Sequence, residues 1–134
     1  MRKIRFRGKG IYEGSDKEEW AFGKLRDSFT IMDLRDREYS VDPETVGQYI
    51  GLQDKNGEDI YEGDVLKFSW MRGFHLVESF HVVRFCENAA AFKFWDGQTW
   101  SPFWGFSDED MEVVGNIFDD PEFNERFGTP YREL

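Results

Sequence analysis

The sequence predicts a mostly β protein, either a strongly bent antiparallel sheet or a partly open small barrel, with a short C-terminal helix. Segments that alternate apolar and polar residues recur along the chain, and Gly, Pro or Asn-Gly turns separate them. Only residues 120–128 carry helix start and stop signals. Aromatic residues make up 18% of the 134 residues, which is enough apolar surface for a core without a metal or a disulfide.

The first part of the chain predicts three short strands. Residues 3–7 alternate basic and apolar side chains, which predicts a strand with one solvated face. Residues 20–25 and 29–34 predict the second and third strands, and the polar residues 35–40 predict a turn. Asp42 precedes Pro43, so the chain turns there, either as an extended segment or as a short helical turn that Asp42 caps.

The middle and end of the chain predict two hairpins and a final strand. Asn56-Gly57 joins the extended run 46–52 to a strand over 60–68, in which Gly63 predicts a bend. Residues 74–86 and 89–95 form the second predicted hairpin, and residues 113–118 the last strand. The helix over 120–128 is expected to have Asp120 as its cap and Gly128 as its end.

Composition excludes several classes of protein. A formal net charge of −10 disfavours general nucleic-acid binding, because such a surface repels phosphate. One cysteine rules out an internal disulfide framework. No segment approaches the ~20 apolar residues of a membrane span, and the basic start of the chain lacks the apolar run of a signal peptide. We therefore expect a cytoplasmic protein without membrane contact, and residues 1–134 as a single domain.

No set of residues predicts catalysis, a metal site or a cofactor site. His75 and His81 would lie on one face of a strand but ~20 Å apart at ~3.3 Å per residue, too far to share an ion. Cys86 would lie on the opposite face from His81, which disfavours a nucleophile–base pair. We therefore expect no enzymatic activity and no cofactor.

Two groups of residues are candidates for binding. The first is an aromatic group between residues 95 and 106, which either anchors a partner or plugs one end of the fold: Trp95, Trp100, Phe103, Trp104 and Phe106. The second is the basic N-terminal strand with Arg5, Arg7 and Lys9. Its basic face is either an ordinary solvated surface or a strip that follows a phosphate backbone.

Residues 43–65, PETVGQYIGLQDKNGEDIYEGDV, closely resemble the signature of the YopX family of phage and prophage proteins. Matching segments follow the family's order at residues 4–9, 20–23 and 113–118. Ile50 stands where the family pattern often has Thr, and residues 69–110 do not match the pattern. The resemblance implies a compact, largely β protein and no transferable catalytic residue. The glycines and the Asn-Gly turn of the signature are typical of a folding element.

These observations favour a phage or prophage accessory protein that binds a host or phage protein. One alternative is an acidic mimic of DNA that occupies a host DNA-binding enzyme, because the net charge of −10 permits it. A second is a nucleic-acid binder that uses Arg5, Arg7 and Lys9, and a carboxylate hydrolase ranks last. Open sheet edges would also permit a homo-oligomer.

Overall fold

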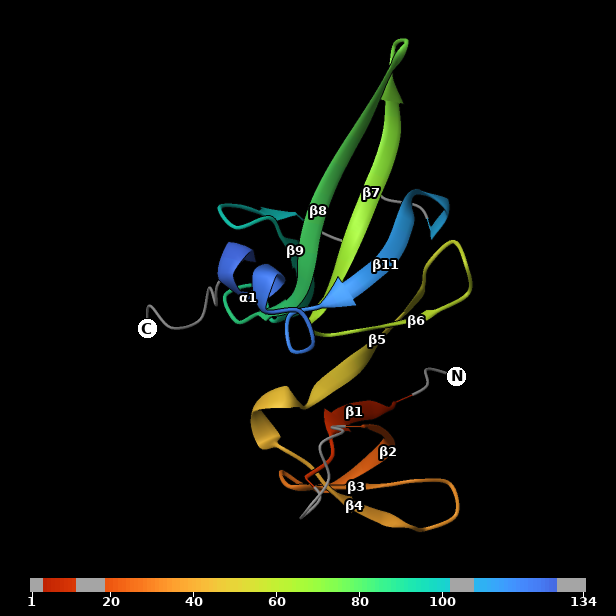
Figure 1. The fold of residues 1–134 in the computed structure, drawn as a ribbon, viewed down its shortest axis with the longest axis vertical. Coiled ribbons are helices and arrows are strands. Elements are labelled where there is room, and N and C mark those ends of the chain that lie inside the picture. The colour runs from red at the N-terminus through yellow and green to blue at the C-terminus, as the bar shows by residue number, and fades with distance from the viewer. Residues whose placement is uncertain (1–3, 12–18, 102–107, 128–134) are drawn as a thin grey trace. The chain divides into compact units, whose positions relative to one another are not determined.

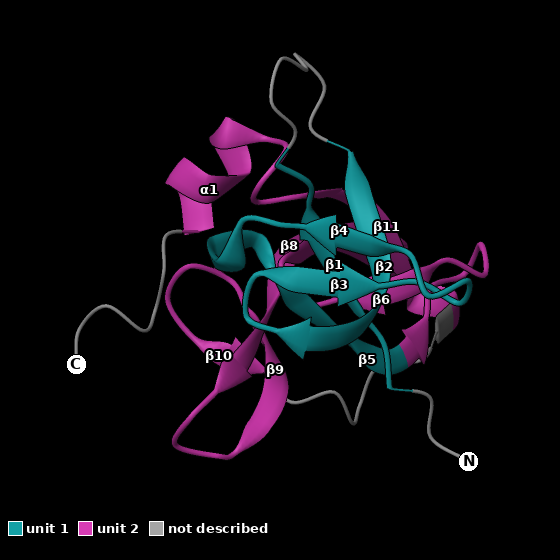
Figure 2. Ribbon diagram, turned by 90° about the horizontal axis from the view of Figure 1, so that it is seen from below, with its two compact units in different colours: residues 1–51 teal, residues 52–134 magenta. Residues whose placement is uncertain are grey.

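The structure, a computed structural model, describes residues 4–11, 19–101 and 108–127 (Figure 1). The chain divides into two compact units, residues 1–51 and 52–134, coloured separately in Figure 2. Two antiparallel sheets have the strand orders β4-β3-β2-β1-β5-β6 and β10-β9-β8-β7-β11. The predicted mostly β fold is therefore confirmed, and the sheets do not close into a full barrel. The single domain stays a prediction.

The strands of the first sheet are β1 (Phe6–Lys9), β2 (Trp20–Asp27), β3 (Thr30–Met32), β4 (Glu38–Ser40), β5 (Gly47–Gln53) and β6 (Asp59–Tyr61). Those of the second are β7 (Asp64–Arg72), β8 (His75–Cys86), β9 (Ala91–Trp95), β10 (Trp100–Ser101) and β11 (Met111–Asn116). Two 3-10 turns, η1 (Pro43–Thr45) and η2 (Asp108–Asp110), and one helix, α1 (Pro121–Phe127), complete the described elements.

In the first unit, one sheet face builds a small core from Ala21, Ile31 and Val41. Residues 38–40, predicted as part of a turn, instead pair with β3 as strand β4, because Tyr39 lies opposite Ile31 and packs against this core. The predicted cap is confirmed: the Asp42 carboxylate accepts the backbone N–H of Glu44 at the start of η1.

In the second unit, side chains on both faces of the sheet are buried, at the ends of β7 and β8 that lie away from the turn joining them. One face packs Val65 and Val82 against Ile117 and Phe127, so helix α1 covers it. On the other face the rings of Phe68 and Phe94 lie with centroids 5.0 Å apart, and both side chains are fully buried. The predicted hairpin of β8 and β9 is confirmed, with Val83 opposite Phe94.

The Asn-Gly hairpin between β5 and β6 forms where predicted, with a different turn. Only Gly57 has a positive φ (80°), and Asp54 accepts the Gly57 N–H while donating its own to Glu58. The Asp54 carboxylate accepts three backbone N–H groups, from Asn56, Glu58 and, across the unit, Val113. The side chain of this buried aspartate therefore connects the hairpin turn to β11.

Gly63 breaks the strand predicted over residues 60–68 and sends the chain from one sheet to the other. It has φ +94°, donates to the carbonyl of Val83 and accepts from the N–H of Ile117. The carboxylate of Asp64 accepts the Tyr61 N–H at 2.8 Å, which makes Asp64 a turn residue. The predicted bend at Gly63 is therefore confirmed.

The C-terminal helix is confirmed over residues 121–127, and Gly128 lies outside the described residues. Asp120 precedes the helix as predicted, but the Asp120 carbonyl, rather than its carboxylate, accepts the N–H groups of Phe123 and Asn124. Its carboxylate instead accepts the N–H of Asn116 at the end of β11. Asp120 therefore fixes the turn between the last strand and the helix.

Candidate binding site

The longest hairpin of the second unit extends beyond its neighbouring strands. Strand β11 pairs with β7 only from Asp64 to Phe68, and β9 pairs with β8 only from Val82 to Cys86. Among the described residues, 69–78 therefore pair only with each other, and Figure 1 shows this two-stranded ribbon beyond the ends of β9 and β11. A two-stranded ribbon in water is marginally stable by itself, so a partner would stabilise it.

The end of this ribbon carries exposed apolar side chains. We call it the hairpin tip, and define it by Trp70, Met71, Phe74 and Leu76. Each of the four is exposed, and Phe74 is 100% exposed. Single exposed apolar residues are common on protein surfaces, but four of them within seven residues at the end of one projecting hairpin are typical of an interaction site.

The geometry of the tip follows from its turn. Arg72 pairs with His75, which leaves Gly73 and Phe74 as a two-residue loop. Gly73 has φ +63°, and Phe74 is not among the residues with positive φ, as in a type II′ turn with Gly at its first central position. Phe74 therefore lies in the loop that closes the hairpin, with its side chain fully exposed.

Strand register distributes the other tip residues over both faces of the ribbon. Trp70 lies opposite Val77, and Met71 lies opposite Leu76. Because successive residues of a strand point to opposite faces, these two cross-strand pairs lie on opposite sides. An apolar surface of this form fits an apolar pocket that receives the end of the hairpin.

Of the predicted aromatic group, the described part belongs to the protein's own packing. The Trp95 indole packs against the core cluster of Val65 and Val82, and its Nε1–H donates to the carbonyl of Phe127 at 2.9 Å. The Trp100 ring lies against Trp95, with centroids 4.9 Å apart. Phe103, Trp104 and Phe106 lie outside the described residues. Of the two interpretations weighed for this group, Trp95 therefore favours the packed one.

The predicted assignment of faces in the N-terminal strand is wrong at one position on the solvated face and one on the apolar face. Arg7 is only 7% exposed, and Ile4, expected to face a core, is exposed. Arg7 is buried against the neighbouring strand, where its guanidinium lies 4.5 Å from the centroid of the Trp20 ring. Arg5 lies over Tyr49 in the same way, and the ammonium of Lys9 lies 5.8 Å from Trp20. Arg5 and Lys9 are half-buried.

In the second unit, His81 and Glu62 have pKa values that are shifted by burial. His81 lies edge-on to Phe68, and burial lowers its pKa although Asp96 opposes the shift. Burial likewise raises the pKa of Glu62, and the nearby Arg84 opposes this shift. Cys86 is a buried free thiol. Within the described ranges, no three His, Cys, Asp or Glu side chains gather as a group that could hold a metal ion.

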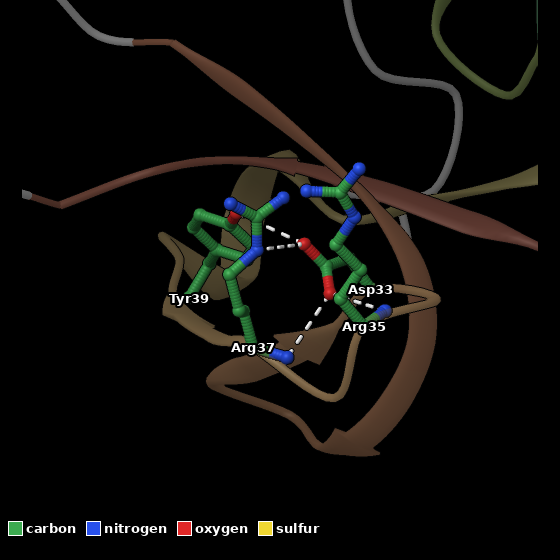
Figure 3. Close-up of polar contacts among 4 residues, drawn as sticks. All are labelled: Asp33, Arg35, Arg37 and Tyr39. Carbon is green, nitrogen blue, oxygen red and sulfur yellow. Dashed lines mark hydrogen bonds and ion pairs between the residues drawn. The ribbon is translucent and has the colours of Figure 1, made fainter.

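A second exposed feature is the turn between β3 and β4, drawn in Figure 3. The Asp33 carboxylate accepts the N–H groups of Arg35 and Arg37 at 2.9 and 3.0 Å, the Arg37 Nε–H at 2.8 Å and the Tyr39 hydroxyl at 3.0 Å (Figure 3). These contacts hold a tight turn that leaves Leu34 fully exposed. The Asp33 carboxylate therefore stabilises the backbone of the turn between β3 and β4.

The hydrogen bonds to Asp33 predict a specific acid response. Desolvation opposes ionisation of Asp33, but the four hydrogen bonds outweigh it and lower its pKa to about 2. An unfolded Asp titrates near ~3.9, so the stabilising effect is complete above that pH and is lost as the pH falls through about 2. In urea titrations, the stability difference between the protein and Asp33→Asn should be constant above about pH 5 and shrink below about pH 4. A difference that grows on acidification would contradict this assignment.

Comparisons with known proteins agree with this fold. Two antiparallel sheets, a signature hairpin and one terminal helix define a small, mostly β protein. A model of the YopX family, described as YopX protein, matches residues 12–124, and the chain therefore belongs to the YopX family. The crystal structure of protein EF1440 from Enterococcus faecalis is similar, with a TM-score of 0.50 and 18% identity over 92% of this chain and 99% of that chain. No curated protein matches the chain.

Among the described residues, no helix is long and apolar enough to cross a membrane. The residues of the hairpin tip were not among the binding candidates predicted from the sequence. The available signal was the cluster of large apolar residues on both sides of Gly73, where a strand end in water would normally be polar.

Proposed function

We propose that this YopX-family protein is a non-enzymatic accessory protein of a phage or prophage, and that it binds another protein through the hairpin tip. The observation that carries the proposal is the full exposure of Phe74 at the end of a ribbon that also exposes Trp70, Met71 and Leu76. Trp is among the residue types that contribute most to binding energy at protein interfaces.

The size of the tip supports a protein as partner. Aromatic side chains bury ~150–250 Å² each, but Trp70 is only 41% exposed, so the four side chains of the tip can bury on the order of 400–500 Å². A standard interface buries about 800 Å² on each partner. The tip therefore supplies about half of one side of a standard interface.

The test replaces one residue of the tip. Phe74→Ser should leave the free energy of unfolding unchanged within about 0.5 kcal/mol, because the ring is already in water. It should weaken binding of the partner about 30-fold or more, as expected for a central aromatic anchor. The matched control is Leu34→Ser, which removes another fully exposed apolar side chain, on the turn between β3 and β4.

The experiment is a pull-down with tagged protein from host lysate at low and high salt, followed by titration of the purified partner. A partner that is retained at high salt and by Leu34→Ser, but lost with Phe74→Ser, would support the proposal. Equal binding by both variants would exclude the tip.

The acidic DNA mimic remains the second candidate. Residues 52–134 carry 17 acidic and seven basic side chains, so the whole formal charge of −10 falls in this unit. A mimic would capture DNA-binding proteins in a complex that weakens steeply with salt and competes with duplex DNA. Capture of such proteins at low salt alone, unaffected by Phe74→Ser, would favour this candidate over the hairpin tip.

A further inference from the structure

The charge of the chain is divided unequally between its two units. Residues 1–51 carry ten basic and ten acidic side chains and are neutral, while residues 52–134 carry the full −10. The argument from net charge against nucleic-acid binding therefore applies to the second unit alone. Within the first unit, the question becomes whether the basic residues gather on one face.

Strand register places basic residues together on the sheet face opposite the small core. Lys9 lies opposite Trp20, and Arg7 lies opposite Phe22. Because side chains alternate along β2, Lys24 shares this face with Trp20 and Phe22, whereas Ala21 faces the core. We call this face of the first unit the basic-aromatic face, and its basic members are Arg5, Arg7, Lys9, Lys24 and Arg26.

Not every cation on this face is equally accessible. The Arg26 guanidinium forms an ion pair with Glu38 on β4, which neutralises this cation. Arg7 is buried against Trp20, so its role is to hold the ring. Lys24 is exposed, and Arg5 and Lys9 are half-buried. Lys24 is therefore the cation most available to an approaching anion.

The aromatic residues of this face lie beside the cations: Trp20 and Phe22 precede Lys24 on β2 and lie opposite Lys9 and Arg7 on β1. Phe22 is 45% exposed at the centre of β2, between Trp20 and Lys24 on the same face. The Trp20 ring is half-buried and is contacted by two cations, Arg7 and Lys9. A ring that projects from a strand between basic side chains can stack on a nucleobase while the cations face the phosphates.

From this arrangement we infer that the basic-aromatic face binds single-stranded nucleic acid. Phe22 stacks on a base, Trp20 supplies a second ring, and Lys24 with Lys9 contacts the backbone phosphates. A single strand fits better than a duplex, because rings on a strand face need unstacked bases. This function lies in a different unit from the hairpin tip and is independent of the partner proposed above.

The test is fluorescence anisotropy with a labelled 12-nucleotide oligodeoxythymidylate and its oligouridylate counterpart at several salt concentrations. We expect binding at moderate salt, with an affinity about tenfold lower in Phe22→Ser, which loses one stacked base. Lys24→Glu should weaken binding by a similar factor and should make the salt dependence less steep by about 0.7 or more in log K against log salt. Tighter binding of one of the two oligonucleotides identifies DNA or RNA as the ligand.

Matched controls keep the result interpretable. Phe29→Ser removes another exposed ring, on the turn between β2 and β3, and Arg35→Glu reverses another exposed charge of the same unit. Both should bind like the unmodified protein, and circular dichroism should show that all four variants are folded. Absence of binding at low salt by the unmodified protein, or equal weakening by the test and control variants, would overturn the inference.

Discussion

Gly63→Ala is expected to lower the free energy of unfolding by about 2–5 kcal/mol. Gly63 has φ +94°, and a left-handed backbone costs an L-residue ~1–2 kcal/mol. A Cβ atom there would lie 2.6 Å from Cε2 of Phe118, a ring packed against the core cluster of the second unit. Overpacking of this kind costs a further ~1–3 kcal/mol. Urea unfolding monitored by tryptophan fluorescence measures the change.

The control for this substitution is Gly57→Ala in the turn of the signature hairpin. Gly57 also has a positive φ, +80°, but nothing lies within 4 Å of the position of its Cβ. Its cost should therefore be the backbone term alone, about 1–2 kcal/mol. If Gly57→Ala destabilised the protein as much as Gly63→Ala, the contact with Phe118 would have no energetic role.

Asp54→Ala is expected to destabilise the protein by about 2–4 kcal/mol. The Asp54 side chain is only 4% exposed, and its removal leaves the N–H groups of Asn56, Glu58 and Val113 without their acceptor. Hydrogen bonds to a charged group contribute ~1.5–3 kcal/mol each, although water would satisfy part of the loss. Urea unfolding again measures the change, and Asp54→Asn should cost less because it keeps one acceptor oxygen.

Asp96→Ala provides the matched control, because Asp96 accepts the N–H groups of Gln98 and Thr99 in a similar turn. That turn is exposed and its contacts are local, so water replaces them and the cost should stay below about 1 kcal/mol. Equal costs for the two aspartates would show that the connection from Asp54 to Val113 on β11 does not stabilise the unit.

Local chemistry made much of the fold predictable. Asn56-Gly57, Asp42-Pro43 and the bend at Gly63 depend on backbone preferences of a few neighbouring residues, and each appears where the sequence indicated. Strand β4 was not predicted, because the polar segment that contains residues 38–40 indicated a turn, and these residues form a strand by pairing with β3. Pairing with a distant partner overrides weak local preference.

The candidate sites were less predictable, for two physical reasons. The alternation of polar and apolar residues along a strand assigns each charged residue to the solvated face. The guanidinium of Arg7 packs on an aromatic ring instead, and the aliphatic part of this side chain is apolar. The hairpin tip is exposed because β9 and β11 end before they reach it, and these lengths depend on pairing between distant segments. The sequence shows the apolar residues between 70 and 76, but it does not show that they are exposed.

The ribbon of residues 69–78 also has a consequence for how recognition could change. Because these residues pair only with each other among the described strands, the pairing of β7 with β11 and of β8 with β9 does not depend on their identity. The end of the β7–β8 hairpin could therefore be replaced by another hairpin of equal length with different side chains. Such a chimera would keep the fold of this protein and acquire a new target. Binding specificity could then change without a change in folding.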